Sequence, residues 1–198
     1  VDRFTNILEV FDELANSVGA FYGFNRTGEL NVGRLTAPTG TALLELDDTN
    51  IIELQRLPTS IPNHRVNVLY KKNYTVLDEE TLAASPADRD FVLRESAVAT
   101  ASSAGTLSVY PNSETLEIDS RLIDSSAASA EATRVVGLYG TQRDVYRIRV
   151  KTQPFTIKLN DLVKITFPRY DLQGGKLFRV ISLFEDAAIN EVELELWG

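Results

Sequence analysis

The chain has 198 residues, 43% of them hydrophobic and 24% charged, which is enough for one sizeable core or two small ones. Its 20 basic and 28 acidic side chains give a net charge of −8, which argues against general nucleic-acid binding because an acidic surface repels phosphate. The absence of cysteine excludes disulfides, thiolate chemistry and cysteine-ligated metal centres.

The N-terminal segment has the clearest helical pattern in the chain. Apolar residues recur with helical spacing over residues 2–18, and acidic residues occupy the opposite face, which we expect to be solvated. Asp2 or Thr5 can cap the start, and Gly19 supplies a left-handed stop. The sequence therefore predicts an amphipathic helix that ends at residue 18.

A β-hairpin is predicted directly after this helix. Residues 21–24 and 30–35 are short apolar runs on either side of a turn that ends in glycine. Aromatic side chains of a hairpin beside an amphipathic helix usually fill the core between the two, so we expect that role, with stacking on a sugar or a base as the alternative. The side chains concerned are Phe21, Tyr22 and Phe24.

The middle of the chain predicts short strands separated by polar turns. Strands are predicted at residues 43–46, 51–57, 64–70, 107–110 and 116–118, with residues 73–77 as a continuation of the third. Residues 78–90 form the most polar stretch and are predicted as a loop with about one helical turn. The pattern of residues 91–101 fits helix or strand, and strand is favoured.

The C-terminal part predicts a second helix followed by four strands. Asp124 caps a helix over residues 125–139, and Gly140 ends it. The four strands that follow alternate between polar and apolar residues, as in an antiparallel meander or barrel segment. Two of these strands carry opposite charges on one face, and they are candidates to meet within one chain or between copies. The charged residues are Arg147, Arg149 and Lys151 on one strand and Glu191, Glu193 and Glu195 on the other.

No catalytic, cofactor-binding or metal-binding residue is predicted. The only histidine is His64, and no motif of a serine hydrolase or a phosphate-binding loop accompanies it. Residues 47–48 and 78–80 are acidic, but their spacing does not follow the calcium-loop pattern. A glycosidase with two carboxylates stays open, because such a pair is set by distance in space and has no sequence motif.

Several segments together resemble a known family. The helix over residues 128–139 leads into the strand 146–150, and Leu159-Asn160-Asp161-Leu162-Val163 follows, with Asn160 where a glycine is common and asparagine also tolerates the left-handed backbone. A turn at residues 174–175 and the closing strand 190–198 complete the block. With the opening helix and residues 19–24, this arrangement resembles the hub or tip proteins of tailed bacteriophages and prophages.

The resemblance implies structural work without a catalytic residue. Such proteins mix β-barrel domains with small helix-plus-sheet domains and form rings that join the tail tube to the spike, fibres or tape-measure protein. It implies other tail or baseplate proteins and identical copies as partners, no cofactor, no specific nucleic-acid binding and a place in the virion tail after synthesis in the bacterial cytoplasm. No run of about 18 apolar residues is present, so no membrane span is predicted.

We therefore predict an α+β, predominantly antiparallel β fold with two lobes interleaved in sequence. Residues 1–45 and 78–140 are assigned to a helix-plus-sheet lobe, and residues 46–77 and 141–198 to a β-barrel-like lobe. The predicted function is a structural component of a phage tail tip or baseplate hub. The alternatives are a carbohydrate- or receptor-binding module and a glycoside hydrolase with two carboxylates. Because the chain lacks methionine even at position 1, we expect a processed product or a piece of a longer protein.

Overall fold

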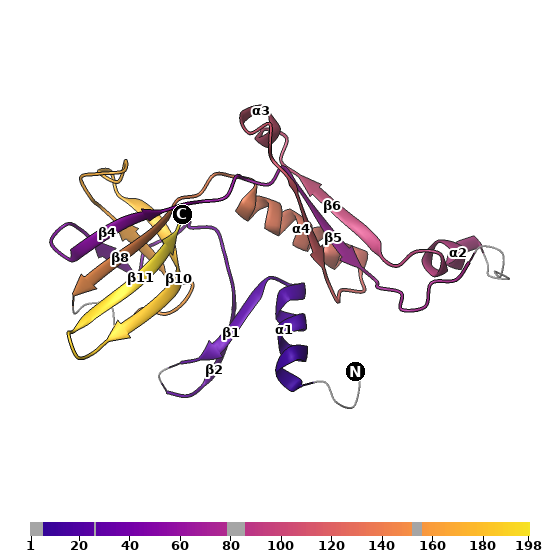
Figure 1. Cartoon of the computed structure of the whole chain (residues 1–198), viewed down its shortest axis with the longest axis horizontal. Coiled ribbons are helices and arrows are strands. Elements are labelled where there is room, and N and C mark those ends of the chain that lie inside the picture. The colour runs from indigo at the N-terminus through magenta and orange to yellow at the C-terminus, as the bar shows by residue number, and fades with distance from the viewer. Residues whose placement is uncertain (1–5, 26, 79–85, 152–155) are drawn as a thin grey trace. The chain divides into compact units, whose positions relative to one another are not determined.

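A computed structural model describes residues 6–25, 27–78, 86–151 and 156–198 (Figure 1). The chain forms two compact units, each built from two separate segments. Unit 1 comprises Val1–Arg34 and Ile61–Thr141, and unit 2 comprises Leu35–Ser60 and Gln142–Gly198. The predicted α+β class with mostly antiparallel strands is confirmed, since six of the eight strand pairs among the described residues are antiparallel.

Unit 1 begins with helix α1 (Ile7–Ser17) and the hairpin of β1 (Ala20–Phe24) and β2 (Leu30–Arg34). The helix cap is Asn6, whose Oδ1 accepts a hydrogen bond from the backbone N–H of Leu8 at 3.1 Å, so the cap lies at neither predicted residue. Gly19 ends the helix with φ of +55°, which confirms the predicted left-handed stop. The hairpin turn is held by Asn25, whose Oδ1 accepts from the backbone N–H groups of Thr27 and Glu29.

The second part of unit 1 is a three-stranded sheet covered on one face by a helix. Its strands lie in the order β6-β5-β7, with β5 at Arg65–Tyr70, β6 at Ala97–Ser102 and β7 at Thr115–Asp119. Helix α4 (Ser125–Tyr139) packs against β5 and β6, as Figure 1 shows, and its bounds are those predicted. The buried side chains between helix and sheet are Val66, Val68, Ala99, Ala128, Ala132 and Val135. Two short helices complete the unit, α2 (Pro86–Val92) and α3 (Thr106–Val109).

Unit 2 is a six-stranded sheet in the order β3-β9-β10-β11-β8-β4, in which only the β3–β9 pair is parallel. The strands are β3 (Leu44–Leu46), β4 (Ile51–Leu57), β8 (Val145–Lys151), β9 (Leu162–Ile165), β10 (Lys176–Asp186) and β11 (Glu191–Trp197). The four predicted C-terminal strands are thus present in the order β9-β10-β11-β8, and each pairs with its neighbours in antiparallel direction. Asn160, before β9, has φ of +68°, as its position in place of a glycine predicts.

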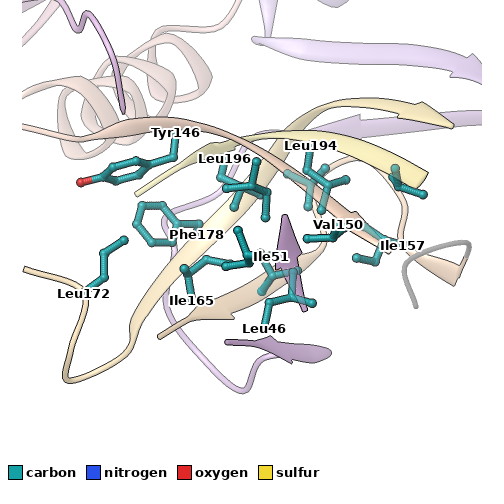
Figure 2. Close-up of a cluster of buried hydrophobic side chains, with 14 residues drawn as sticks. Leu46, Ile51, Tyr146, Val150, Ile157, Ile165, Leu172, Phe178, Leu194 and Leu196 are labelled. Atoms are coloured by element: carbon teal, nitrogen blue, oxygen red, sulfur yellow. The ribbon is translucent and has the colours of Figure 1, made fainter. Parts of the chain in front are cut away.

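The sheet of unit 2 encloses a single apolar core, shown in Figure 2. Alternate residues of each strand point inward, and contributions also come from Ile157 and Leu172 in the connecting segments. Tyr146 meets Phe178 edge to face, with ring centroids 5.5 Å apart. The alternation of polar and apolar residues in the sequence therefore predicts which side chains lie on the inner and outer faces of this sheet.

The observed units have different boundaries from the predicted lobes. Residues 46–77 were assigned to the barrel-like lobe, but β5 within this range pairs with β6 and β7 and buries Val66 and Val68 under α4. Conversely, β3 and the segment before it belong to unit 2, because β3 pairs with β9. Both differences arise from pairing between strands far apart in sequence, which an alternating pattern does not encode.

Two local predictions are wrong, and the strand favoured for residues 91–101 is present only from residue 97 onward. Residues 107–110 lie largely in helix α3, where the Thr106 hydroxyl donates to the Gly140 carbonyl at 2.9 Å and Leu107 and Val109 stay exposed. Residues 91–101 contain the end of α2 and only then β6, and residues 73–77 form no strand. A short apolar run does not distinguish helix from strand, which accounts for the errors at residues 107–110 and at residues 91–92. Much of the predicted loop at residues 78–90 lies outside the described residues.

Candidate assembly surface

The six charged residues that the sequence singled out lie together on the outer face of the unit 2 sheet. On β8, Tyr146, Ile148 and Val150 are buried, so the alternate residues between and after them project away from the core. On β11 the inner positions are likewise apolar. The register places Glu195 opposite Arg147, Glu193 opposite Arg149 and Glu191 opposite Lys151. We call this set the charged ladder.

Arg147 forms the tightest contacts of the ladder. Its Nη2 and Nε lie 2.6 Å and 3.1 Å from Oε1 of Glu195, and its Nε lies 3.5 Å from Oε1 of Glu193. The hydrogen bonds to Glu195 and the two nearby carboxylates raise the pKa of Arg147 above its usual value. The side chain of Arg147 is 44% exposed, so water screens these pairs and each adds little to stability.

Arg149 extends the ladder to a third strand. Its Nη2 lies 3.2 Å from Oε2 of Glu53 on β4, and its Nε lies 3.5 Å from Oε2 of Glu191 on β11. The sequence prediction missed Glu53, because a register shift between Ile51 and Glu53 brings it opposite Arg149. Lys151 makes no ion pair with any residue that the structure describes. The pairing that the sequence left open therefore occurs within one chain.

One end of this sheet is held by a separate carboxylate, Asp144. Its Oδ1 accepts from Nη2 of Arg56 at 2.6 Å and its Oδ2 from Nζ of Lys176 at 3.0 Å, while its backbone pairs in both directions with Gly198. Burial acts to raise the pKa of Asp144, but the hydrogen bonds and charges of Lys176 and Arg56 together lower it below its usual value. Asp144 thus joins β4, β10 and the end of the chain.

A buried carboxylate, Glu131, holds the N-terminal part of unit 1 against α4. It accepts from Nη2 of Arg34 and from Nη2 and Nε of Arg134, the latter two at 2.6 Å and 3.0 Å. Both arginines also donate to the carbonyl of Val18, at the end of α1, where the helix dipole favours positive charge. No sequence signal marks this cluster, because its members lie on α4, on β2 and at the end of α1.

Helix α1 is amphipathic as predicted, but most of its apolar face is exposed. Ile7 is 69% exposed, and the hairpin beside the helix exposes Phe24 at 78% and Val32 at 67%. The other exposed apolar residues of the helix are Leu8, Phe11 and Leu14. Apolar side chains gathered on one helix and its adjoining hairpin are a common feature of protein–protein contact surfaces. We call these six residues the α1 surface.

The hairpin aromatics do not form one stacking platform. Phe21 packs over Gly33, where a Cβ would meet its ring, whereas Tyr22 and Phe24 project from the opposite face of β1. The Tyr22 hydroxyl donates to Oδ1 of Asp12 at 2.6 Å, and its ring lies 5.8 Å from that of Phe11. The Tyr22 pKa is raised, chiefly by that hydrogen bond. Only Phe24 is left for contact with a ligand.

The remaining candidate positions show structural roles. Asp47 accepts from the backbone N–H and the hydroxyl of Thr49, which together lower its pKa and hold the turn between β3 and β4. The His64 carbonyl accepts from the N–H of Ser103 at 2.8 Å. Among the described residues, no group of His, Asp and Glu has the arrangement of a metal site. Within the same ranges no helix is long and apolar enough to cross a membrane.

The fold as a whole is shared with solved tail proteins. A tail protein from Neisseria meningitidis MC58 aligns with 100% of this chain and 56% of its own length, at a TM-score of 0.61 and 14% identity. A chain of the virion of a native gene transfer agent particle aligns over 94% of this chain and 37% of its own, at 0.58 and 14%. The 43 kDa tail protein of prophage MuSo2 from Shewanella oneidensis aligns over 99% and 52%, at 0.53 and 14%.

These likenesses confirm, at the level of the fold, the resemblance to tail proteins that the sequence indicated. This chain spans about half of two of these proteins and a smaller share of the third. No protein-family model matches the sequence, and the search of curated proteins found no match.

Proposed function

We propose that this chain is a structural component of a phage tail tip or baseplate hub, or of a phage-tail-like particle, which joins the tail tube to the distal tip proteins. The observation that carries the proposal is the shared fold, which extends over nearly the whole chain in three tail or particle proteins. Its partners are then other tail or baseplate proteins and identical copies in a ring, its place is the virion tail, and its role is non-enzymatic.

The surfaces of the two units support an assembly role. The α1 surface presents apolar side chains to solvent, and burying such side chains against a partner stabilises a complex by about 25 cal/mol for each Å² removed from water. The charged ladder presents a polar face on which most charges already have partners. We infer that this ladder aligns neighbouring subunits, with Lys151 available for a carboxylate of a partner.

Deleting the gene from the genome that encodes it tests the proposed function. We expect electron microscopy of the particles to show tail tubes without a complete tip, or no tails, because the tube has nothing to join it to the distal proteins. Complementation with the unchanged gene is the control and restores the tip. A tagged copy is expected at the distal end of the tail. Complete, infectious tails in the deletion strain would contradict the proposal.

A second candidate, a carbohydrate- or receptor-binding module, is favoured by one observation. Phe24 is 78% exposed on the β1–β2 hairpin, where an aromatic ring can stack on a sugar. Binding of the chain to a panel of bacterial surface glycans, compared with the Phe24→Ala variant, tests this role. Binding that Phe24→Ala abolishes would support it, and no binding by the unchanged chain would remove it.

A further inference from the structure

We propose that copies of this chain join edge to edge through the three-stranded sheet of unit 1, with β6 of one copy paired to β7 of the next. The inference rests on the ring proposed above and specifies its interface. Its occupant is a second copy of the same chain, and the contact is a shared β-sheet.

Both edges of this sheet are open in the described residues. Strand β5 lies in the centre, and β6 and β7 each pair with β5. Within the part of the chain that the structure describes, no other backbone hydrogen bonds join β6 or β7 to another element. Helix α4 packs on one face of the sheet, over Val66, Val68 and Ala99, and so leaves the edge N–H and C=O groups without strand partners. An open edge is a template for pairing with another chain.

The strand directions make the two edges complementary. Strand β6 is antiparallel to β5, and β7 is parallel to β5, so β6 and β7 run in opposite directions. When a second copy continues the sheet with its α4 on the same face, its β6 meets β7 of the first copy in antiparallel pairing. This head-to-tail contact uses two different surfaces of each copy, and such contacts form a ring when the rotation from one copy to the next closes.

Charge favours pairing of β6 with β7 over pairing of β7 with a second β7. Glu117 and Asp119 lie on the open face of β7, and Asp119 is already paired with Nζ of Lys72 at 2.9 Å. Two β7 strands would therefore bring Glu117 beside a second acidic residue. Strand β6 carries no charged residue, although exposed edges commonly carry charges that prevent pairing. Its exposed residues Val98 and Thr100 accept an acidic neighbour without like-charge repulsion.

The sides of β6 and β7 that face α4 are also complementary where β6 of one copy would meet β7 of the next, a contact that we call the seam. There β6 contributes Ala99 and Ala101, which are small, and β7 contributes Leu116 and Ile118, which are large and only partly buried. Placing large side chains beside small ones lets the apolar layer under α4 continue from one copy to the next. Pairing of two β6 strands would place small against small, and it would give closed dimers that leave β7 open.

Cysteine cross-linking tests the seam directly, because the chain has no cysteine of its own. Thr100 and Glu117 both lie opposite Asn67, on either side of β5. Two strand spacings separate them by about 9.6 Å, which is beyond the roughly 7 Å limit for a disulfide, so the double variant Thr100→Cys/Glu117→Cys cannot cross-link within one chain. The register is scanned with nine double variants that combine Val98, Thr100 or Ser102 with Thr115, Glu117 or Asp119.

For one register we expect oxidation of the full-length protein to give a ladder of covalent oligomers larger than dimers on a non-reducing gel. The single-cysteine variants are the matched controls and should stay monomeric on the same gel. Covalent dimers from Thr100→Cys alone would show β6 paired with β6 and would overturn the seam. The native mass of the unoxidised protein, by light scattering, accompanies each gel.

The cross-linking gels and the native mass, taken with the deletion strain, distinguish a wrong β6–β7 seam from a wrong assignment as a hub protein. If the unoxidised protein is oligomeric and none of the nine double variants cross-links, the β6–β7 seam is wrong while the proposed hub stands. If the protein is monomeric, no variant cross-links and the deletion strain builds complete tails, both proposals fail. A monomer that does not cross-link overturns the seam even when the deletion strain lacks a tip.

Discussion

Replacing Glu131 with alanine is the sharpest test of how unit 1 is held together. The carboxylate is only 4% exposed and accepts hydrogen bonds from Arg34 and Arg134, which also cap the end of α1 through the Val18 carbonyl. Removing it leaves two cations facing each other without their shared anion. The substitution therefore weakens the contact of α1 and the hairpin with α4.

The size of the effect follows from the exposure of the partners. Breaking a fully buried ion pair costs about 3–5 kcal/mol. The side chains of Arg34 and Arg134 are 44% and 24% exposed, so water compensates part of their lost partner. We expect Glu131→Ala to lower the free energy of unfolding of unit 1 by about 2–3 kcal/mol.

Hydrogen exchange followed by mass spectrometry measures this loss of stability separately for each helix and strand. Such resolution is needed because the two units need not unfold in one transition. Protection should fall in α1, β1 and β2, while the strands of unit 2 keep theirs. Glu13→Ala is the matched control, because Glu13 also pairs with an arginine, Arg121, but is 57% exposed, and it should cost less than about 1 kcal/mol. Equal losses for the two variants would refute the reasoning.

Three further predictions concern single residues. Asp144→Asn should lower the stability of unit 2 by about 1–2 kcal/mol at neutral pH; folding lowers the pKa of Asp144 from its ordinary value of 3.8. The difference in stability between the unchanged chain and Asp144→Asn should therefore shrink in acid denaturation curves as the pH falls through the folded-state pKa. Gly137→Ala should stabilise α4 by about 0.5–1 kcal/mol in thermal melts, since its Cβ meets no atom, whereas Gly140→Ala should destabilise because its Cβ would lie 2.5 Å from the Val136 carbonyl. Ile148 is fully buried, so Ile148→Ala should cost about 2–5 kcal/mol in urea unfolding. Arg147→Ala beside it should have a much smaller effect, because water screens the ion pairs of Arg147, and similar losses for the two variants would contradict the assigned faces.

The features that the sequence predicts well are those that depend on neighbours along the chain. Helix α4 begins after Asp124, whose side chain accepts from the N–H of Ala127, and ends before Gly140, as capping rules require. The alternation in β8 and β11 separates buried residues from partly or fully exposed ones along both strands. The six residues of the charged ladder were predictable for the same reason, because the alternation of polar and apolar residues shows which side chains share the outer face of each strand.

The features that the sequence does not predict depend on which strand lies beside which. Strand β5 alternates as cleanly as the strands of unit 2, so its pattern alone does not assign it to the sheet of unit 1. Glu53 joins the ladder only through the β4–β8 register, and Glu131 meets Arg34 across 97 residues of sequence. Helix α3 is short and exposed, so its apolar residues give no period to read.

The charges of unit 2 and the apolar residues of unit 1 have different parts in any assembly that this chain forms. In the charged ladder most carboxylates and guanidinium groups already have partners within the chain, so a new subunit gains little by pairing with them. Such a face orients a partner through its pattern of charge more than it binds one. The α1 surface and the open edges of β6 and β7 gain far more on contact. The apolar side chains of the α1 surface are exposed, and the outer backbone groups of β6 and β7 have no strand partner among the described residues. Subunit affinity should therefore reside in unit 1.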